Sequence, residues 1–314
     1  MLPLLRRLAS PLSRGFDHVY ARLPGAIEVG AFLQEPPRGR LAPYWVTAAP
    51  TLRNPGWQLV SSDQHDDPAY ASWCEQMRIA PQRQRKQWEW VYILEVLRQH
   101  GTLAEGARGL GFGCGKEPIS AIAAKHGCTI VATELAEQDA ADAGWAKSGQ
   151  YACRLEDLNA GGLCSPSEFA ERVSFRHCDM NAIDTDLRDF DFVWSSCALE
   201  HLGGLKPGLE FIENAMQCLR PGGIAVHTTE FNLGSNDNTL DRRSTCIYRK
   251  RDIEALALRM LELGHGVGTL NFTTGTGQDD VFVDLPPYKS PVHLRLLLKR
   301  HLSTSIGLYV IRGH

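Results

Sequence analysis

Short apolar runs alternate with helix-like runs through the middle of the chain. The runs at 129–134, 173–180 and the start of 191–201 are rich in β-branched or aromatic residues and too short for helices, so we expect buried strands there. Helix-like runs at 119–125 and 209–219 precede the first strand and follow the last one. Strands that alternate with helices predict parallel βαβ units, and therefore an α/β fold.

The flanking regions have different patterns. Residues 24–80 are broken by repeated prolines and carry three tryptophans, which indicates either a cap over the substrate mouth or plain structural packing. Residues 82–99 contain neither Gly nor Pro and are apolar on most sides, which predicts a buried helix. Toward the C-terminus we expect strands at 224–229, 281–284 and 305–311, a helix at 251–263 and a basic helical turn at 293–301.

The segment Met1–Leu23 combines leucines with four arginines, and Asp17 is its only acidic residue. This composition is compatible with a basic amphipathic helix on a membrane surface, with an organelle transit sequence, or with a helix packed on the domain. The chain has no apolar run near the length of about 18 residues that a spanning helix needs. We divide the sequence into an N-terminal helix and cap, residues 1–84, and a main domain, residues 85–314.

The main domain contains a glycine-rich turn ahead of the helix-like run at 119–125. Gly111, Gly113 and Gly115 form a GxGxG pattern just before the helix-like run at 119–125. Glycine suits a sharp turn that approaches a ligand closely, because it has no Cβ and accepts positive φ angles. Glu134 ends the next strand, 19 residues after Gly115, where a nucleotide-binding βαβ unit places a ribose-binding carboxylate.

The spacing argues against two common nucleotide sites. A dinucleotide fingerprint needs GxGxxG, but its third glycine would fall on Cys114, Lys116 or Pro118. A phosphate-binding P-loop would need Gly at position 110 and Ser or Thr at 117, where the chain has Leu110 and Glu117. The pattern therefore favours a ligand that has a ribose but no pyrophosphate.

At this point the chain resembles the class I S-adenosylmethionine-dependent methyltransferases over roughly residues 85–235, with the motifs at 109–115, Glu134, Asp179-Met180, 190–201 and 219–223. The resemblance implies that the glycine turn lies under the methionine moiety and that Glu134 binds the ribose hydroxyls. It further implies that Asp179 faces the adenine amino group, that Met180 packs on the ring and that Ser195 lines the floor of the site.

The implied fold is a Rossmann-like seven-stranded sandwich, parallel except for the last strand in sequence, 305–311, which inserts beside the fifth. The chain departs from the family at Gly109, where an acidic residue is usual. Contact with the amino end of the cofactor must then come from elsewhere, with Glu117 or the helix around Trp88 as candidates. Arg83, Arg85 and Lys86 are candidate partners for the cofactor carboxylate, although a solvated basic turn explains them equally well.

Composition limits the partners. A formal net charge of −3 gives no general attraction to polyanions, so we expect no nucleic-acid partner. The nine cysteines include no CxxC pair, which is typical of reduced thiols in a cytoplasmic protein rather than of disulfides or a zinc site. Convergent carboxylates for a metal cannot be inferred from the spacing, so we expect metal-independent chemistry. The oligomeric state stays open.

Methyl transfer to a hydroxyl benefits from a general base, and histidine has a suitable pKa. His201 follows the fourth strand and is the preferred base, with a structural role as the alternative, while His227 lies in the middle of the next expected strand. We therefore expect an O-methyltransferase that acts on a small molecule or glycan. The alternatives are an N- or C-methyltransferase for a specialised metabolite or lipid head group, and a non-catalytic cofactor-binding partner subunit.

Overall fold

The computed structural model describes residues 28–142 and 149–314. The helix expected within Met1–Leu23 lies outside the described residues, and so does its suggested contact with a membrane. Within the described ranges, none of the helices has the length and apolar character required to cross a bilayer.

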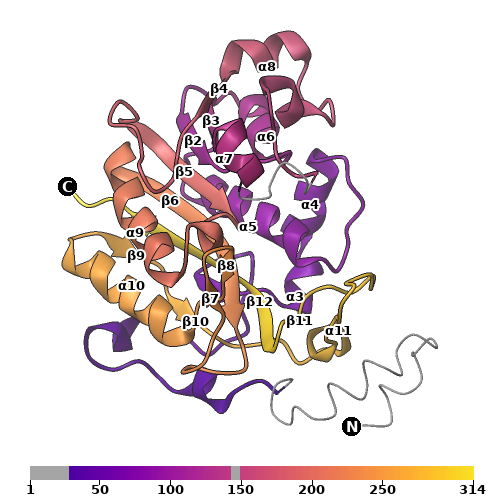
Figure 1. The fold of residues 1–314 in the computed structure, drawn as a ribbon, viewed down its shortest axis with the longest axis vertical. Coiled ribbons are helices and arrows are strands. Elements are labelled where there is room, and N and C mark those ends of the chain that lie inside the picture. The colour runs from indigo at the N-terminus through magenta and orange to yellow at the C-terminus, as the bar shows by residue number, and fades with distance from the viewer. Residues whose placement is uncertain (1–27, 143–148) are drawn as a thin grey trace.

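One ten-stranded sheet forms the centre of the molecule, with the main order β4-β3-β2-β5-β6-β12-β1-β10, and β9 and β11 pair with β12 (Figure 1). Among the described strands of this sheet, β12 alone runs antiparallel to its neighbours. The strands are β1 (Trp57–Leu59), β2 (Arg108–Phe112), β3 (Thr129–Glu134), β4 (Val173–His177), β5 (Phe190–Ser196), β6 (Leu219–Asn232), β9 (Gly266–Val267), β10 (Leu270–Asn271), β11 (Leu296–Leu298) and β12 (His301–Ile311). A separate pair joins β7 (Asp241–Arg242) to β8 (Thr245–Cys246).

Helices cover both faces of the sheet. The α-helices are α3 (Ser62–His65), α4 (Pro68–Gln76), α5 (Arg85–Gln99), α6 (Ile119–Lys125), α7 (Glu137–Asp142), α8 (Pro166–Arg172), α9 (Leu205–Ala215), α10 (Lys250–Glu262) and α11 (Gln278–Val281). Short 3-10 helices are η2 (Ala31–Gln34), η3 (Gly39–Tyr44), η5 (Leu155–Asn159), η6 (Leu199–His201) and η7 (Met216–Cys218). Figure 1 shows α6 and α8 near β3 and β4, and α9 and α10 toward the opposite end of the sheet.

Two apolar cores result, one on each face. The side chains of α4, α5, α6 and α8 form one core, and those of α9 and α10 form the other together with η2 and η3. Strand β5 feeds both, because successive strand residues point to opposite faces: Phe192 and Trp194 belong to the first core and Val193 to the second. The continuous apolar run at this strand therefore reflects burial on both sides.

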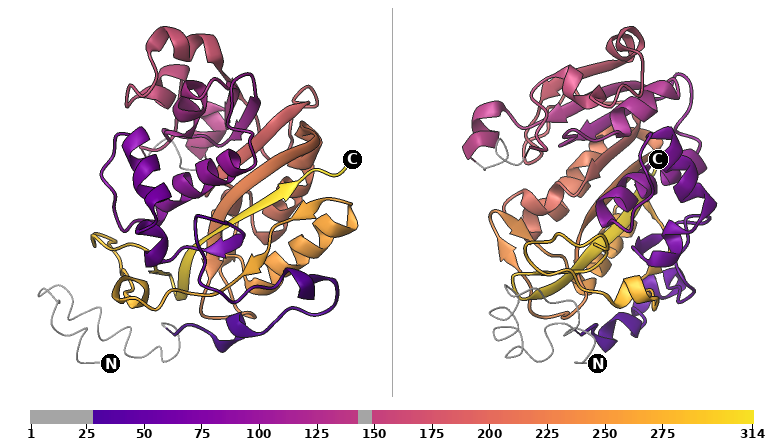
Figure 2. Two further views of the ribbon diagram at one scale, coloured as in Figure 1. Left: turned by 180° about the vertical axis from the view of Figure 1, so that it is seen from behind. Right: turned by 90° about the vertical axis from the view of Figure 1, so that its right-hand side faces the viewer.

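The structure confirms the Rossmann-like α/β sandwich. It also confirms that the last strand lies beside the fifth expected strand, 224–229, which is part of β6. Strand β12 pairs with β6 over nine residue pairs from Ser303 to Ile311, and the left-hand view of Figure 2 shows the yellow strand in the middle of the sheet. The seventh position belongs to β1, which comes from the predicted cap and pairs with β12. The N-terminal part thus contributes a strand to the main sheet, and β9, β10 and β11 add three short strands.

Two predicted elements are wrong. The strand expected at 281–284 does not form: helix α11 ends at Val281, and of the following residues only Asp284 makes an isolated bridge, to Leu296. Asp280 stabilises the start of α11 by accepting hydrogen bonds from the backbone N–H groups of Gly277 and Ser62. The basic helical turn expected at 293–301 is a hairpin instead: Leu296–Leu298 pair with β12, and Lys299 turns the chain with a φ of 61°. Ser62, which contacts α11, is distant in sequence, whereas the hairpin pairs residues that are neighbours in sequence.

Candidate active site

The candidate site lies where the parallel strands end. Phe112 of β2 is in register with Thr133 of β3 and Ser195 of β5, so the residues after these positions meet at one edge of the sheet. Residues at the carboxyl ends of parallel strands commonly form ligand sites in open α/β sheets. The glycine turn, Glu134, Asp179 and η6 all follow such strand ends.

The three positions of the turn require glycine for different structural reasons. A Cβ on Gly111 would lie 2.3 Å from Cys114 Sγ and 2.4 Å from the Trp194 ring, so packing alone requires glycine there. Gly113 and Gly115 have φ angles of 57° and 53°, in the left-handed region that favours glycine. Both conformational and steric demands therefore meet in the predicted GxGxG turn.

Gly113 brings two predicted site segments together. A Cβ on Gly113 would lie 3.0 Å from the Cβ of Ala198, after β5, and 3.6 Å from Sδ of Met180, after β4. Met180 is buried, while Asp179 beside it is exposed and accepts a hydrogen bond of 2.8 Å from the backbone N–H of Asn181. This arrangement places an apolar side chain and an exposed carboxylate next to the glycine turn.

Glu134 faces the same turn from the end of β3. Its Oε1 accepts a hydrogen bond from the backbone N–H of Gly115. Burial raises the pKa of Glu134 to about 7, and the bond from Gly115 opposes this only in part. Near neutral pH this group can therefore change between a carboxylate that accepts hydrogen bonds and a neutral carboxyl group.

Ser195 does not line the crevice as predicted. It is fully buried, and its Oγ lies 2.8 Å from Nδ1 of His227, which is also fully buried. Burial lowers the pKa of His227 to about 3, so this imidazole is neutral and unsuited to act as a base at neutral pH. Because neighbouring strand residues point to opposite faces, Ser196 presents its hydroxyl to helix α5 in place of Ser195.

Lys86, in the first turn of α5, lies at the centre of the opposite wall. Its Nζ is 2.5 Å from Oε1 of Glu117 and 3.4 Å from Oε2 of Glu89. The same ammonium donates to the backbone oxygen and Oγ of Ser196, at 3.2 and 3.0 Å. Burial opposes the charge of Lys86, but Glu117 and Glu89 raise its pKa above the ordinary value. The group is therefore a fixed cation between α5, the glycine turn and β5.

Arg85, next to Lys86, joins α5 to the other side of the sheet. Its guanidinium pairs with Glu230 of β6 and lies 3.2 Å from Oγ of Ser305 on β12. Burial opposes its charge, while Glu230 and Glu89 raise the pKa of Arg85. Glu89 and Glu230 in turn accept hydrogen bonds of 2.5 Å from Ser305 and Ser303, both on β12. Arg85 and Lys86 thus belong to a buried ionic network, whereas Arg83 pairs with Asp66 and Asp279 outside it.

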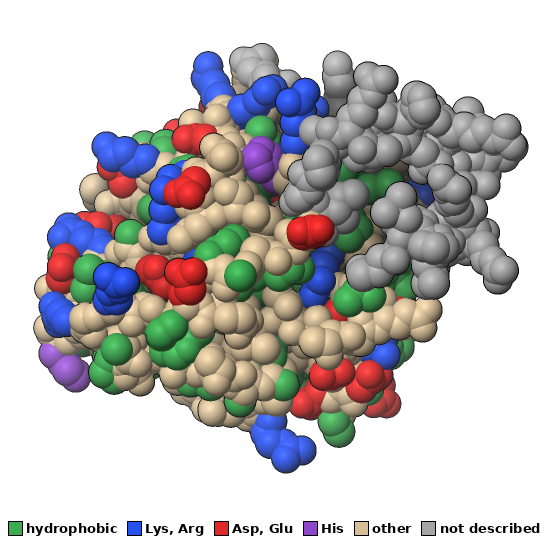
Figure 3. Space-filling view, turned by 90° about the horizontal axis from the view of Figure 1, so that it is seen from below, with side chains coloured by type: hydrophobic (Ala, Val, Ile, Leu, Met, Phe, Trp, Pro, Cys, Tyr) green, Lys and Arg blue, Asp and Glu red, His purple; other side chains and the backbone are tan. Residues whose placement is uncertain are grey.

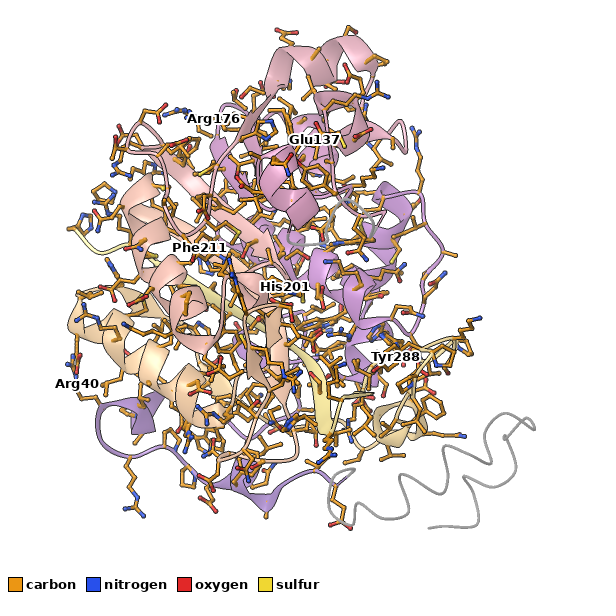
Figure 4. All side chains as sticks on the ribbon, viewed as in Figure 1. Arg40, Glu137, Arg176, His201, Phe211 and Tyr288 are labelled. Atoms are coloured by element: carbon orange, nitrogen blue, oxygen red, sulfur yellow. The ribbon has the colours of Figure 1, made fainter. Side chains whose placement is uncertain are left out.

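His201 lies on η6, beyond the end of β5, and Figure 4 shows it near the middle of the molecule. Its Nδ1 is 2.8 Å from the backbone oxygen of Ser244, and its Nε2 is 4.0 Å from Oε1 of Glu200. Glu200 is buried and accepts a hydrogen bond of 2.9 Å from Thr229. Burial raises the pKa of Glu200, and the nearby His201 offsets part of this rise.

Sequence reasoning missed Glu89, Ser196 and the contribution of β12. A signal for Glu89 was present, because it interrupts the apolar run of α5 three residues after Lys86, at a spacing that puts the two on one helix face. The serines of β12 gave no comparable signal, since their partners Glu89 and Glu230 lie far away in sequence.

These residues fit S-adenosylmethionine as a cofactor. The backbone of the glycine turn leaves no room for side chains, Glu134 can accept hydrogen bonds from ribose hydroxyls, and Met180 offers an apolar surface for a base. Two buried polar atoms on the Lys86 side have no hydrogen-bond partner in the described structure, Oε2 of Glu117 and Nε1 of Trp90. No group of three or more His, Cys, Asp or Glu side chains within 28–142 and 149–314 is arranged to hold a metal ion.

The sequence matches one known domain family. Residues 110–227 match the methyltransferase domain family. No curated protein matches the sequence. A candidate sarcosine dimethylglycine methyltransferase from Galdieria sulphuraria is similar at 15% identity over 81% of this chain and 92% of that chain, with a TM-score of 0.46. An S-adenosylmethionine-dependent methyltransferase from Mesorhizobium loti is 15% identical over 69% and 96%, with a TM-score of 0.43. Phosphoethanolamine N-methyltransferase 2 from Haemonchus contortus is 16% identical over 70% and 52%, with a TM-score of 0.44.

Proposed function

We propose that this chain, a class I S-adenosylmethionine-dependent methyltransferase, methylates a hydroxyl group of a small molecule or glycan, with His201 as the general base. When bound, the cofactor supplies a methyl group that is already activated by its sulfonium. The residues of the chain then have two tasks, which are to align the acceptor with the methyl group and to remove the hydroxyl proton.

The orientation of His201 is the observation that carries this proposal. The backbone oxygen of Ser244, 2.8 Å from Nδ1, can only accept a hydrogen bond, so Nδ1 carries the proton of the neutral ring. The lone pair of the neutral imidazole is then on Nε2, the atom that can take a proton. A backbone contact that fixes the tautomer is the same device that orients catalytic histidines in general.

Glu200 supports the charge that His201 would gain. Its carboxylate is 4.0 Å from Nε2, at a distance where opposite charges attract in a partly buried site. Thr229 holds the other oxygen of Glu200, which keeps the carboxylate in place. Glu200 would therefore lie beside the imidazole when His201 removes the proton.

A polar cavity elsewhere at the carboxyl-terminal edge of the sheet would suit a hydroxylated acceptor. A cavity of about 160 Å³ lies at the end of β6, and its lining includes Asn232, Ser235, Asn238 and Arg300. Amide, hydroxyl and guanidinium groups of this kind can exchange hydrogen bonds with several hydroxyl groups. On the face in Figure 3, the described Lys and Arg side chains are interspersed with Asp and Glu, which is not the single-signed surface that nucleic acids favour.

The test uses the purified chain, methyl-labelled S-adenosylmethionine and separate pools of small metabolites and glycans. We expect one labelled product whose carbon NMR shift is that of a methyl ether or ester. A label on nitrogen or carbon would contradict O-methylation, and cofactor binding without turnover would favour a non-catalytic subunit.

With the acceptor in hand, His201→Ala should lower the maximal rate by roughly 10²–10⁴-fold, because one positioned base contributes about that much. Cofactor affinity should stay nearly unchanged, and part of the rate should return at high pH. His100→Ala is the matched control, because His100 is exposed at the far end of α5. A rate loss below about threefold would remove His201 from the mechanism.

A further inference from the structure

We infer that Lys86 and Glu117 form a binding site for a zwitterionic group, the α-carboxylate and α-ammonium of the cofactor. This pair would replace the acidic residue that is usual at position 109 in the class I S-adenosylmethionine-dependent methyltransferases. The inference rests on the cofactor assignment and is independent of the identity of the acceptor. It gives the two residues specific tasks: Lys86 binds the carboxylate and Glu117 binds the ammonium.

Position 109 cannot carry an acidic side chain in this fold. Gly109 lies inside β2, between β3 and β5, and is buried. A Cβ there would lie 2.3 Å from the Phe192 ring and 2.8 Å from Cδ1 of Ile130. A carboxylate at this position would enter an apolar core without a partner, which is strongly unfavourable. Recognition of an ammonium group must therefore come from another carboxylate.

Glu117 is placed to provide that carboxylate. It follows Gly115 of the glycine turn by two residues and is largely buried, with 11% of its side chain exposed. Its Oε1 pairs with Lys86, whereas its Oε2 is buried and has no hydrogen-bond partner in the described structure. An unpaired buried carboxylate oxygen is unfavourable, so a donor from a ligand would satisfy it.

Lys86 and Trp90, one turn apart on α5, supply hydrogen-bond donors beside Glu117. The indole N–H of Trp90 faces Glu117 and partly opposes the rise of its pKa, although the pair falls short of a full hydrogen bond in the described structure. The ammonium of Lys86 already contacts Glu117, Glu89 and Ser196, and 35% of the Lys86 side chain is exposed. The two donors, Lys86 and Trp90, can bind the carboxylate of a free amino acid, and the carboxylate of Glu117 can bind its ammonium group.

Charge balance favours a ligand that brings an ammonium group to Glu117. The local network holds two cations, Arg85 and Lys86, against three carboxylates, Glu89, Glu117 and Glu230, and so has one carboxylate in excess. The carboxylate of the same ligand would then lie beside Lys86, so that each charged group of the ligand meets an opposite charge. Burial raises the pKa of Glu117, as expected for a carboxylate that has only one cationic partner.

The first experiment compares three ligands on the unmodified chain by calorimetry. S-adenosylhomocysteine has both charged groups, its decarboxylated form lacks the carboxylate, and 5′-methylthioadenosine lacks both. We expect affinity to fall by roughly 10- to 100-fold at each step, the range for hydrogen bonds to charged groups. Equal affinity for S-adenosylhomocysteine and 5′-methylthioadenosine would overturn the inference without any variant.

Two variants then assign the groups. Lys86→Met should weaken S-adenosylhomocysteine by roughly 10- to 100-fold and leave the decarboxylated ligand within about threefold. Glu117→Gln should weaken both of these ligands and leave 5′-methylthioadenosine unchanged. The exposed pair Lys206–Glu210 on α9 provides the controls Lys206→Met and Glu210→Gln, which should change none of the three affinities.

The outcomes separate a binding role from a structural one. If Lys86→Met or Glu117→Gln weakens all three ligands equally, the pair only supports the fold and the inference is wrong. If the parent chain binds no S-adenosylhomocysteine, the cofactor assignment fails together with the inference. A failure of O-methylation would leave these measurements unaffected, because they need no acceptor.

Discussion

The two halves of the sheet are built in different ways. The cofactor half, strands β2, β3 and β4, comes from one continuous stretch of chain, 108–177, with only residues 143–148 outside the described structure. The acceptor half, strands β6, β12 and β1, comes from 219–232, 301–311 and 57–59. Local βαβ units make the first half, whereas pairing between distant segments makes the second.

The two halves also use different interactions. In the cofactor half, backbone conformation defines the site: Gly113 and Gly115 have positive φ, and a backbone N–H binds Glu134. In the acceptor half, buried charges hold the walls together, as in the contact between Arg85 and Glu230. A site made by backbone geometry tolerates few substitutions, while one made by charge pairs depends on both partners remaining in place.

The largest expected effect is on the cofactor half. Gly113→Val should lower affinity for S-adenosylhomocysteine by roughly 10³-fold or more, because a β-branched residue resists a φ of 57° and its side chain would enter the space between Ala198 and Met180. Calorimetry would measure the loss. Tight binding of NAD by the parent chain would contradict the cofactor assignment.

Gly101→Val separates conformational strain from the effect on the site. Gly101 has a φ of 69°, yet a Cβ there would meet nothing within 4 Å. Both variants should therefore lose stability, by about 1–3 kcal/mol for the left-handed backbone, but only Gly113→Val should lose the ligand. Equal affinities in the two variants would show that the turn does not contact the cofactor.

The contrast between the halves explains what the sequence could predict. Helix α6 and strand β3 have the predicted bounds, 119–125 and 129–134, because their patterns are local and continuous. Strand β1 could not be predicted, since three residues in a proline-rich segment form a strand only when β12 and β10 supply hydrogen bonds. The error at 293–301 has a different cause, because that hairpin pairs residues that are neighbours in sequence.

The site follows the same division. The glycine turn and Glu134 were predicted from spacing and Met180 from the family resemblance, and the structure brings Gly113 next to Met180. Ser195 was assigned to the crevice, but the pleat of β5 turns it toward His227 and turns Ser196 toward Lys86. A shift of one residue along a strand exchanges the two faces of the sheet, and apolar residues on both sides gave no indication of the register. The roles of Glu134, Asp179 and His201 stay predictions.

A smaller effect should distinguish the acceptor half. Arg85→Met should lower the free energy of unfolding by about 3 kcal/mol, because it leaves the buried carboxylate of Glu230 without its partner. Adding Glu230→Leu should recover a large part of the loss, since the double variant has no unpaired charge. Urea unfolding would measure both changes.

The exposed pair Arg259–Glu213 is the control for that experiment. Its arginine side chain is half exposed, and Arg259→Met should change stability by less than about 1 kcal/mol. An Arg85 variant as stable as the Arg259 variant would show that the acceptor half does not depend on its buried ion pair.

The smallest expected effect is a pair of opposite pH dependences. His227, in the acceptor half, has a pKa lowered to about 3 by burial, so the unfolded chain binds more protons below its ordinary pKa of 6.5. Its contribution to stability is present above pH 6.5 and should fall by about 1 kcal/mol between pH 7 and 5.5. Glu134, in the cofactor half, has a pKa raised from 4.5 to about 7, so its contribution is present below pH 4.5 and is lost as pH rises through 7.

Two variants should therefore change the pH profile of unfolding in opposite directions. His227→Phe removes a group that destabilises the fold in acid, so its stability should fall less than that of the parent between pH 7 and 5.5. Glu134→Gln removes a group that stabilises the fold in acid, so its stability should fall more, by about 1–2 kcal/mol over the same interval. Each variant also loses a hydrogen bond, to Ser195 or to Gly115, which lowers its free energy of unfolding by the same amount at every pH. This loss does not affect the comparison, because only the change of stability with pH is compared. Parallel profiles for the parent and both variants would show that neither burial shifts the proton affinity of its group.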